Sequence, residues 1–543
     1  MINVSNSGDA PIIPASVSDR QGFNKRWYAS NDQLQIYRPT AGIDVVDAFN
    51  TVLRDKTIEP GQCQITCGRH CYEGFVYNPS TKAVIDLTGL KSYGEATVGS
   101  IPSIYLDVGL GNWDMYRLLN NVYQKTVPAG SCYSVGLGGH ITGGGYGVLS
   151  RLYGLSIDYL IAIDIVIGDR KNGARMISQC SATNQPELFW AIRGGGGGQF
   201  GIITRYYFDL QNLPDSPDYI YIQSLNWNWM LSNSNNPISF ETFSSILNYF
   251  QDVYTNQSES SWNTFGIFHG NHMDAGSLGF SSVDIYNESL HGIHTNFETE
   301  LLSRHENRLK EAELLSPLSM DDLVINGHPY IPSTKALGLN PESSSRGYTF
   351  LEGMQQLNAS GPNRYGKYKS AYHTQKFTDS MMKAAYSGLT QKVIDPNGKS
   401  VNMKNSLIQF DAYGGKINTV PSNATAITQR SSIMKLQYQS YWDTSLPPGY
   451  DDETLKTAHV SWLNQIYQNI YSDSGGIPNG IGTEGCYYNY PDIYIGSTKA
   501  GTPPIQQALS LYFGKNLDRL VNVSATYNPE SWFQNSQSIS NIA

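Results

Sequence analysis

Two glycine-rich turns carry side chains that could form bonds to a cofactor. His70 lies in GRHCYEG, and Cys132 lies in PAGSCYSVGLGGHITGGGYG. Such turns expose consecutive backbone N–H groups, which can line an anionic pyrophosphate without a lysine. Imidazole and thiol are also the two kinds of side chain nucleophilic enough to attach to an oxidised flavin ring. Taken singly, a hydrogen-bonded loop histidine or a small buried cysteine is the ordinary interpretation. Together with the glycines, the pair favours a flavin site.

A third glycine-rich segment, GGGGGQFG, contains the spacing GxGxxG at Gly196, Gly198 and Gly201. A nicotinamide-binding turn of this kind needs a strand before the glycines and a helix after them. Here the helix-prone LFWAIR precedes the glycines and the β-branched IITRYYF follows them. Because this order is wrong for that fold, we interpret the segment as a turn whose backbone lies against a flat group such as a cofactor.

The segments around these turns predict an α+β alternation. A short strand is expected at 34–37, and a β-prone piece leads into the turn of His70. Further strands are expected at 83–90, 103–111, 159–169 and 202–210, with a helix at 112–124. Another helix, at 43–53, is expected to bury an apolar face that recurs near every 3.6 residues, namely Ile43, Val46, Phe49, Val52 and Leu53.

The texture of the sequence changes after Leu213, where Pro214 and Pro217 punctuate the chain. Aromatic strands are expected beyond this point at 219–227 and 262–270, with helices at 240–253 and 297–315. Three later segments carry polar groups at alternate positions, as strands facing a ligand would; they are 407–415, 433–442 and 486–494. The change of texture predicts a domain boundary near residues 213–220.

Composition excludes several classes of protein. Of 543 residues, 40% are hydrophobic and 15% charged, which favours a packed globular protein over a disordered or coiled-coil one. The 37 tyrosines suit surfaces that hold polar, partly apolar ligands such as sugars. A net charge of -9 without basic clusters argues against nucleic acid as a partner. No apolar run is long enough for a membrane span, and no signal peptide is evident, so a soluble chain is expected, either secreted or cytoplasmic.

Three cysteines four residues apart, Cys63, Cys67 and Cys71, resemble metal-ligand spacing on a helix. Glycines interrupt that window and no second cluster of CxxC type follows, so no metal site is expected. A disulfide between Cys63 and Cys180 is an alternative that the spacing leaves open.

Seven segments, in order, resemble the signatures of hexose-oxidase-type carbohydrate oxidases. These enzymes belong to the berberine-bridge-type FAD-linked oxidases of the vanillyl-alcohol-oxidase superfamily. The resemblance runs from Gln21 to Ser538, and it is carried by GRHCYEGFV, PAGSCYSVGLGGHITGGGYG, LFWAIRGGGGGQFGIITRYYF, GPNRYGKYKSAY, IMKLQYQSYW, EGCYYNYPD and LYFGKNLDRL. It implies an α+β fold in which a two-part PCMH-type FAD-binding domain, residues 1–213 and 491–543, flanks a substrate domain. That domain, residues 214–490, would hold an antiparallel sheet covered by helices.

The resemblance also implies one FAD attached twice, through His70 to the 8α carbon and through Cys132 to C6. The turn from Thr66 to Cys71 would bind the pyrophosphate. The other cofactor-binding positions that it implies are Gly68, Arg69, Gly136, Gly139, His140, Gly143, Gly144, Ile203 and Asn489. Relatives usually carry glycine where this chain has Arg69. If the turn needs a positive φ there, an arginine would be strained.

In the related oxidases, a Tyr of a YxNY motif removes the proton from the anomeric hydroxyl with an Asp as partner, and Tyr487 and Asp411 match these roles. A phenol's pKa near 10 lies closer to that of a sugar hydroxyl than a carboxylate's pKa near 4. Tyr488 would point to the opposite face of a strand, and it stays open as the alternative base. The expected substrate contacts are Tyr72, Gln409, Gln437 and Lys435.

The resemblance therefore predicts a flavoprotein oxidase acting on CH–OH groups. It would oxidise the anomeric carbon of mono- and oligosaccharides to the 1,5-lactone and reduce dioxygen to hydrogen peroxide. Sugar and dioxygen are its expected partners, with the preferred sugar and the oligomeric state left open. A tailoring oxidase of a glycosylated natural product or a secondary-metabolite alcohol would share every FAD motif and differ only in the groove. A carbohydrate-binding protein without catalysis would have no use for His70 and Cys132.

Overall fold

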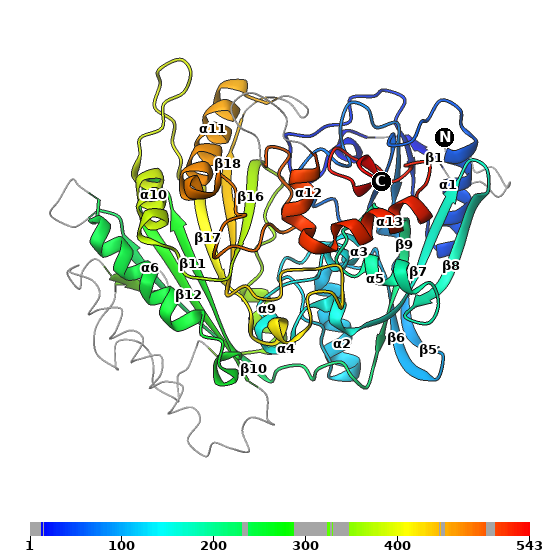
Figure 1. Cartoon of the computed structure of the whole chain (residues 1–543), viewed down its shortest axis with the longest axis horizontal. Coiled ribbons are helices and arrows are strands. Elements are labelled where there is room, and N and C mark those ends of the chain that lie inside the picture. Colours follow the sequence, from blue (N-terminus) through cyan, green and yellow to red (C-terminus); the bar gives the residue numbers. More distant parts are fainter. Residues whose placement is uncertain are drawn as a thin grey trace.

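The computed structural model describes residues 12–14, 16–230, 237–286, 323–325, 328–329, 347–444, 446, 451–495 and 505–543. These residues form three sheets with helices packed against them, arranged as two halves side by side (Figure 1). One half contains two sheets built from residues before 210, and the other contains a nine-stranded sheet. The molecule is therefore an α+β protein with antiparallel pairing in its larger sheets, as predicted.

The first half contains a four-stranded and a five-stranded sheet. The four-stranded sheet has the order β1 (Ile12–Pro14), β2 (Gln35–Tyr37), β4 (Ala83–Asp86) and β3 (Cys63–Thr66), with β2, β4 and β3 parallel. The antiparallel five-stranded sheet has the order β5 (Tyr93–Val98), β6 (Ile101–Asp107), β9 (Ile202–Asp209), β7 (Leu160–Asp169) and β8 (Gly173–Ser181). Because β3 ends at Thr66, the turn of His70 starts at the carboxyl end of a parallel strand.

The nine-stranded sheet forms the second half. Its order is β14 (His328–Pro329), β13 (Leu323–Ile325), β10 (Tyr219–Asn228), β12 (Ser277–Tyr286), β11 (Thr264–Asn271), β17 (Ser406–Ala412), β18 (Met434–Trp442) and β16 (Tyr365–His373), and β15 (Gly347–Thr349) pairs with β10. The register of β17 and β18 pairs Gln409 with Gln437 and Asp411 with Lys435. Four of the predicted site residues therefore lie in one small patch of the sheet.

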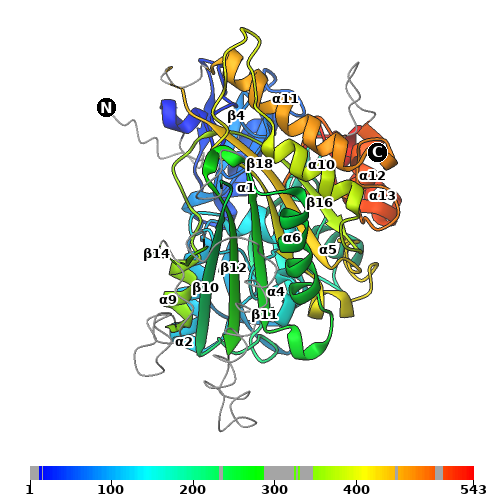
Figure 2. The ribbon, with the colours of Figure 1, turned by 90° about the vertical axis from the view of Figure 1, so that its left-hand side faces the viewer.

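Helices cover one face of this sheet (Figure 2). They are α6 (Phe240–Tyr254), α10 (Asp379–Thr390) and α11 (Glu453–Ile470). The other described α-helices are α1 (Gly42–Arg54), α2 (Asn112–Tyr123), α3 (Leu137–Thr142), α4 (Ser150–Tyr153), α5 (Pro186–Ile192), α9 (Phe350–Gln356), α12 (Ile505–Phe513) and α13 (Leu517–Tyr527). None of the helices within the described ranges is long and apolar enough to cross a membrane.

Helix α1 occupies the predicted residues, but part of its predicted apolar face is wrong. Its buried residues are Val45, Ala48, Phe49, Val52 and Leu53. Ile43 is 61% exposed, because it precedes the first buried position by two residues and so lies on the opposite side of the helix. The buried face packs against β7 and β8. A face starting at Val45 has the same helical spacing, which shows why spacing alone did not select the starting residue.

Most other predicted elements are confirmed, including the strands that became β2, β6, β7, β9, β10, β11, β17 and β18 and the helices α2 and α6. The strand expected at 83–90 ends early, because the Asp86 carboxylate accepts the Thr88 N–H and starts a 3-10 turn. The expected strand at 486–494 is wrong. Gly485 has a φ of +73°, and the Tyr490 N–H donates to the Tyr487 carbonyl in a turn. The predicted helix at 297–315 lies outside the described residues.

The C-terminal segment returns to the first half, where α13 packs against α5 (Figure 1). Gln199 connects the two parts, because its carbonyl accepts from Asn528 Nδ2 and its side-chain oxygen accepts from the Ile539 N–H. We keep residues 1–213, 214–490 and 491–543 as the proposed division into an N-terminal FAD-binding segment, a substrate domain and a returning segment.

Candidate active site

A cavity of about 420 Å³ lies between the nine-stranded sheet and the first half of the molecule. Three predicted site residues stand behind its wall. Gly143 lies against Asn489, Gly144 lies against Ile427, and Lys435 is fully buried. All the other predicted residues line the cavity: Thr66, Gly68, Arg69, His70, Cys71, Tyr72, Cys132, Gly136, Gly139, His140, Ile203, Gln409, Asp411, Gln437, Tyr487 and Asn489.

The turns of His70 and Cys132 contact each other backbone to backbone. A Cβ at Gly68 would lie 2.2 Å from the Gly136 nitrogen, and a Cβ at Gly136 would lie 2.7 Å from Cys67 Sγ. No side chain fits in either position, so both glycines are required by the close approach. This contact brings His70 and Cys132 to the same cavity from positions 62 residues apart in the sequence.

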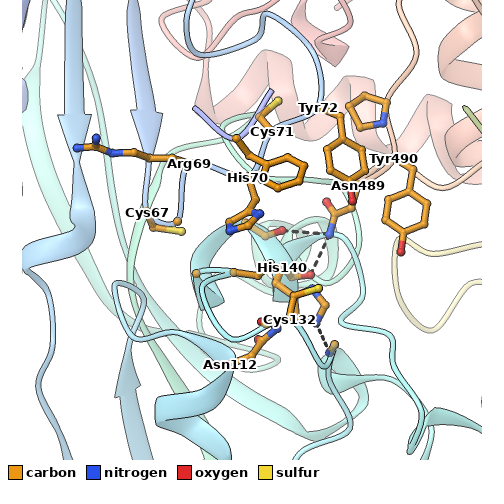
Figure 3. A pocket seen from close by; sticks show the side chains of 18 of the residues that line it. Cys67, Arg69, His70, Cys71, Tyr72, Asn112, Cys132, His140, Asn489 and Tyr490 are labelled. Carbon is orange, nitrogen blue, oxygen red and sulfur yellow. Dashed lines mark hydrogen bonds between the residues drawn. The ribbon is translucent and has the colours of Figure 1, made fainter. Parts of the chain in front are cut away.

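Arg69 adopts the left-handed conformation that the sequence analysis considered, with a φ of 59°. This conformation is uncommon for a residue with a Cβ and costs roughly 1 kcal/mol. The guanidinium forms ion pairs with Asp86 and Asp19, and Figure 3 shows it extending away from the group formed by His70, His140 and Cys132. The ion pairs therefore hold an arginine in a turn that otherwise favours glycine.

The two histidines of the cavity are neutral at neutral pH. Burial lowers the pKa of His70 to about 4, and burial lowers that of His140 to about 4 as well. His140 Nε2 accepts a hydrogen bond of 2.9 Å from the Gly130 N–H, whereas His70 Nε2 lies 2.8 Å from Ser134 Oγ. A neutral imidazole has a free lone pair, which a nucleophile requires. Burial raises the pKa of the Cys132 thiol.

The other cysteines form no disulfide. All six are free thiols, and Cys63 and Cys180 are both buried. The Cys63–Cys180 disulfide considered from the sequence is therefore absent. Among the described residues, no group of three or more His, Cys, Asp or Glu side chains could hold a metal ion.

Asn489 ties the YxNY segment to the glycine turn after Cys132. Its Nδ2 donates to the Gly139 carbonyl at 3.2 Å and to the His140 carbonyl at 3.0 Å (Figure 3). A Cβ at Gly143 would lie 2.2 Å from the Asn489 side chain, which explains the glycine at 143 by packing and not by contact with the cavity. Asn489 thus positions the neighbouring tyrosines relative to His140.

The segment 194–201 connects α5 to β9, in the order that the sequence predicted. Gly197, Gly198 and Gly201 line the cavity. A Cβ at Gly198 or Gly139 would meet no atom within 4 Å, so both positions present bare backbone to open space. Gly196 instead lies against the Tyr488 ring. The open backbone is consistent with a flat group lying against it.

Polar side chains form a row along β17 and β18 where these strands face the cavity. Gln409 Nε2 donates to Asp411 at 2.7 Å, and Gln439 Nε2 donates to Gln409 at 3.2 Å. Tyr441 donates to Gln439 at 2.6 Å, and Gln437 Nε2 donates to the Tyr72 hydroxyl at 3.3 Å. Gln439 and Tyr441 were not among the residues predicted from the sequence. The alternation that selected Gln437 continues to both of them, so the signal was present.

Lys435 lies behind this row and does not line the cavity. Its Nζ is 3.6 Å from Asp411 Oδ2 and 4.2 Å from the ring centroids of both Tyr146 and Tyr490. The distance to the Tyr487 ring is 5.1 Å. Burial lowers the pKa of Lys435 to about 8, against the attraction of Asp411. An ammonium beside an aromatic ring favours the ionised form of a phenol. Tyr146, within the glycine-rich segment after Cys132, was missed by the sequence analysis.

The three tyrosines of the YxNY segment have different surroundings. The Tyr487 hydroxyl accepts from Asn489 at 3.2 Å, and burial raises the pKa of Tyr487. The pKa of Tyr490 is raised by burial, by the neighbouring Tyr72 and then by Asp411. Asp411 is not among the groups that shift the pKa of Tyr487. Tyr488 hydrogen-bonds Gln199 and packs against aromatic rings of α12. Of the three tyrosines in this segment, Tyr490 therefore lies nearest to the charged pair of Asp411 and Lys435.

The residues of this cavity fit a flavin. Backbone open at Gly139 and Gly198 gives a flat group room, and His70 and Cys132 supply the two nucleophilic side chains that can attach to its ring. The turn at Thr66–Cys71 begins at a strand end and is glycine-containing, as a pyrophosphate-binding turn requires. The polar row of β17 and β18 leaves a hydrogen-bonding surface for a substrate at the other side.

Comparison with known proteins agrees with this geometry. The family model described as "Berberine and berberine like" matches residues 486–540. Hexose oxidase from Chondrus crispus is 33% identical over 97% of this chain and 93% of its own length. The chain belongs to the berberine bridge enzyme-like family of FAD-linked oxidases. It is thus a flavoprotein oxidase acting on CH–OH groups, with FAD as its cofactor and a small molecule as its substrate.

Oxidases with other substrates are also similar to the chain. Aclacinomycin-N/aclacinomycin-A oxidase from Streptomyces galilaeus is 29% identical over 96% of this chain and 87% of its own. A glycopeptide hexose oxidase, solved in complex with teicoplanin, has a TM-score of 0.77 and 25% identity, covering 98% of this chain and 99% of its own. Glucooligosaccharide oxidase from Acremonium strictum, described with a 6-S-cysteinyl, 8α-N1-histidyl FAD, shares the fold at a TM-score of 0.68 and 21% identity, covering 97% and 95%.

Proposed function

We propose that the chain oxidises the anomeric carbon of mono- and oligosaccharides to the 1,5-lactone and passes the electrons to dioxygen, giving hydrogen peroxide. The observation that carries this proposal is the row of amides and hydroxyls on β17 and β18, facing the same cavity as His70 and Cys132. Neutral amides donate and accept at once, as neighbouring sugar hydroxyls require. Tyr72, stacked on Tyr368 at 3.8 Å between centroids, adds an aromatic face beside this row.

FAD, when bound, accepts a hydride from the substrate carbon. We propose that His70 and Cys132 hold it through two covalent bonds. A ring fixed at two points needs little enclosing protein, so the cavity can stay open toward oligosaccharides. Thr66, Gly68, Arg69 and Cys71 would line its pyrophosphate, and the other proposed cofactor contacts are Gly136, Gly139, His140, Ile203 and Asn489. Gly143 and Gly144 lie behind the cavity wall and would support this turn without touching the cofactor.

The proton of the anomeric hydroxyl needs a base. The YxNY motif predicted Tyr487 as this base, with Asp411 as its partner. We now favour Tyr490, because Lys435 Nζ lies 4.2 Å from its ring centroid and 5.1 Å from that of Tyr487. Ionisation of Tyr490 would be stabilised by the Lys435 ammonium, and Asp411 would keep that ammonium charged. Gln409 and Gln437 would orient the sugar so that its hydroxyl faces the phenol.

The second candidate function is a tailoring oxidase of a glycosylated natural product or secondary-metabolite alcohol. It is favoured by the similarity to the aclacinomycin and glycopeptide oxidases, which extends over nearly the whole chain. Both candidates use the same flavin site and differ in what the groove accepts.

Peroxide production over a panel of substrates tests the proposal. The panel holds glucose, lactose, maltose, cellobiose, and glycosylated aromatic compounds at equal concentration. We expect turnover of disaccharides as well as monosaccharides, with release of one lactone per peroxide. Turnover of the glycosylated aromatics alone would favour the second candidate, and a strict preference for glucose would contradict the open groove.

A further inference from the structure

The imidazole of His70 is held between an aromatic ring and a hydroxyl. The Phe23 ring stacks on it, with the ring centroids 5.0 Å apart and an angle of 24° between the planes. Nε2 of His70 lies 2.8 Å from Ser134 Oγ, whereas Nδ1 has no hydrogen-bond partner among the residues that the structure describes. One nitrogen of the ring is therefore engaged and the other is free, in a plane that the neighbouring ring sets.

The segment that carries Phe23 also fixes the backbone on both sides of His70. The Phe23 N–H donates to the Arg69 carbonyl at 2.8 Å. Asn24 Nδ2 donates to the Tyr72 carbonyl at 2.5 Å. The place of the Phe23 ring over the imidazole is therefore set by hydrogen bonds to the turn itself, and it does not depend on the stacking alone.

The same segment is anchored to the second half of the molecule. The Arg364 N–H donates to the Phe23 carbonyl at 3.1 Å, and the Lys25 N–H donates to the Arg364 carbonyl at 3.0 Å. Asn24, which is 1% exposed, also donates from Nδ2 to the Gly366 carbonyl of β16 at 2.9 Å. Because these contacts hold the segment from two sides, the Phe23 ring has a fixed place in the cavity wall.

The hydrogen bond to Ser134 can select the tautomer of a neutral imidazole. Burial lowers the pKa of His70 to about 4, so the ring carries one proton at pH 7. Ser134 Oγ lies 3.3 Å from Ser360 Oγ, which can accept the hydrogen of Ser134 and so leave a lone pair for a proton on Nε2. A proton on Nε2 leaves the lone pair of the ring on Nδ1. The nitrogen without a hydrogen bond is then the nucleophilic one.

We propose that Phe23 and Ser134 are positioning residues for FAD attachment, because they hold the His70 ring in one plane and one tautomer with Nδ1 as the attacking nitrogen. The inference rests on the proposed double attachment of FAD, and it assigns a role to two residues that the proposed sugar oxidation does not use. Both would act through His70 and neither would bond to the cofactor. Attack on the 8α carbon needs a lone pair aligned with that carbon, and a ring held in one orientation supplies this alignment.

Atoms and electrons balance in this step. A bond forms between His70 Nδ1 and the 8α carbon, while one C–H bond of that carbon and the N–H bond at Nε2 break. The 8α carbon is oxidised, and the flavin ring takes up the two electrons of the broken C–H bond. These electrons pass to dioxygen, which takes up the two released protons and forms one hydrogen peroxide. Afterwards Nε2 has a lone pair and accepts the hydrogen of Ser134, so a hydroxyl pairs with Nε2 before and after the step.

Attachment is measured on the full-length chain without any sugar. Phe23→Leu removes the ring face and Ser134→Ala removes the hydroxyl, whereas Phe23→Tyr and Ser134→Thr are matched controls that keep them. Phe23 is half-buried and Ser134 is exposed, so these substitutions leave the buried core unchanged.

Two measurements are made on each protein. Chain produced under riboflavin limitation is mixed with FAD in air and quenched in acid at intervals, and mass spectrometry after proteolysis follows flavin on the His70 peptide and on the Cys132 peptide separately. Hydrolysis of the fully loaded protein releases the histidyl flavin, and chromatography against Nδ1-linked and Nε2-linked standards identifies the bonded nitrogen. A general loss of stability would not change which nitrogen is bonded.

We expect the unaltered chain and both controls to carry flavin on His70 through Nδ1 alone. Phe23→Leu should slow attachment at His70 roughly tenfold or more, because the ring can then rotate. Ser134→Ala should slow it about fivefold, as the loss of one neutral hydrogen bond does. Attachment at Cys132 should change less than about twofold, and Nε2-linked flavin should appear in both variants.

The outcomes separate this inference from the functions on which it rests. Nε2-linked flavin in the unaltered chain, or variants that match it in both rate and bonded nitrogen, would overturn the positioning role alone. An unaltered chain without flavin on His70 would overturn the double attachment and the positioning role with it. Because no sugar is present, a failed sugar panel would leave these results unchanged.

Discussion

Lys435 Nζ lies 3.6 Å from Asp411 Oδ2, and both side chains are buried in the wall of the cavity. The register of β17 and β18 sets this pair directly across the sheet. Lys435 also lies 4.2 Å from the ring centroids of Tyr146 and Tyr490. A buried charge is stable only beside its counter-ion, so the pair keeps a cation next to the tyrosine that we propose as the base.

Replacing Lys435 by Met is expected to lower kcat by roughly 10²-fold or more, because an ionised phenol loses its neighbouring cation. Burial lowers the pKa of Lys435 to about 8, so the ammonium is present below pH 8 and is lost above it. The kcat of the unaltered enzyme should therefore fall as the pH rises through about 8, and the kcat of the Lys435→Met variant should not fall over this pH range. Peroxide release from pH 5 to 10 measures kcat and its pH dependence for the unaltered enzyme and the variant. Lys435→Arg is the control that keeps the charge. A kcat within threefold of the unaltered enzyme would contradict this role.

Two Phe substitutions distinguish the candidate bases. Tyr490→Phe is expected to lower kcat by roughly 10²- to 10⁴-fold with little change in KM, because it removes the hydroxyl that takes the proton. Tyr487→Phe removes a hydroxyl that accepts from Asn489, and we expect a loss of less than tenfold. Steady-state peroxide detection on one good substrate gives both values. If Tyr487→Phe abolishes turnover and Tyr490→Phe keeps it, the assignment made from the sequence is right and ours is wrong.

The proposed attachment predicts a simple colour test. Acid-precipitated protein should stay yellow, and it should stay yellow in His70→Ala and in Cys132→Ala, because one covalent bond remains in each. The double variant should release all its flavin into the supernatant. Absorbance of pellet and supernatant measures the outcome, and Cys71→Ala, which removes another thiol lining the same cavity, is the control. Yellow pellets from the double variant would require a different attachment site.

A buried charge cluster predicts how the protein responds to acid. Lys367 donates to both Glu73 and Asp492, and Lys369 donates to Asp492, joining the His70 turn, β16 and the YxNY segment. Burial raises the pKa of Asp492, but the two lysines outweigh it and hold that pKa at about 2. Since an unfolded Asp has a pKa near 4, this stabilisation is present above pH 4 and is lost as the pH falls toward 2.

Asp492→Asn should therefore lower the free energy of unfolding at pH 7 by about 3–5 kcal/mol, because it leaves two buried lysines short of a counter-ion. The difference in free energy of unfolding between the variant and the unaltered protein should shrink as the pH falls from 4 to 2. Urea denaturation at several pH values measures it. The exposed Lys376–Asp252 pair offers the matched control, since Asp252→Asn should cost less than about 1 kcal/mol. Equal costs for both variants would contradict the role of the buried cluster.

Local sequence patterns were sufficient to predict most of the strands, helices and turns near the site. Strand β3 followed by a glycine turn, the helix–glycine–strand order around residues 194–201, and the alternation along β17 and β18 were all predicted from residue type and spacing. They are predictable because periodicity and glycine content act over a few residues. Two features were not predicted. The start of the α1 apolar face depends on which face of the helix the sheet covers, and the absence of a strand at 486–494 depends on one backbone turn at Gly485.

By itself, the sequence predicted the α+β class and proposed a flavin site at His70 and Cys132, because strand alternation and nucleophiles in glycine turns are local features. The FAD-linked oxidase family followed from the resemblance of its motifs to known ones. Only the tertiary structure decided which tyrosine of the YxNY segment lies nearest to Lys435, that Gly143 supports Asn489, and that Ser360 reaches Ser134 from the other half of the molecule. These relationships join residues that are 50 to 350 positions apart. Their distances follow from sheet register and from the packing of the two halves, and neither is encoded by spacing along the chain.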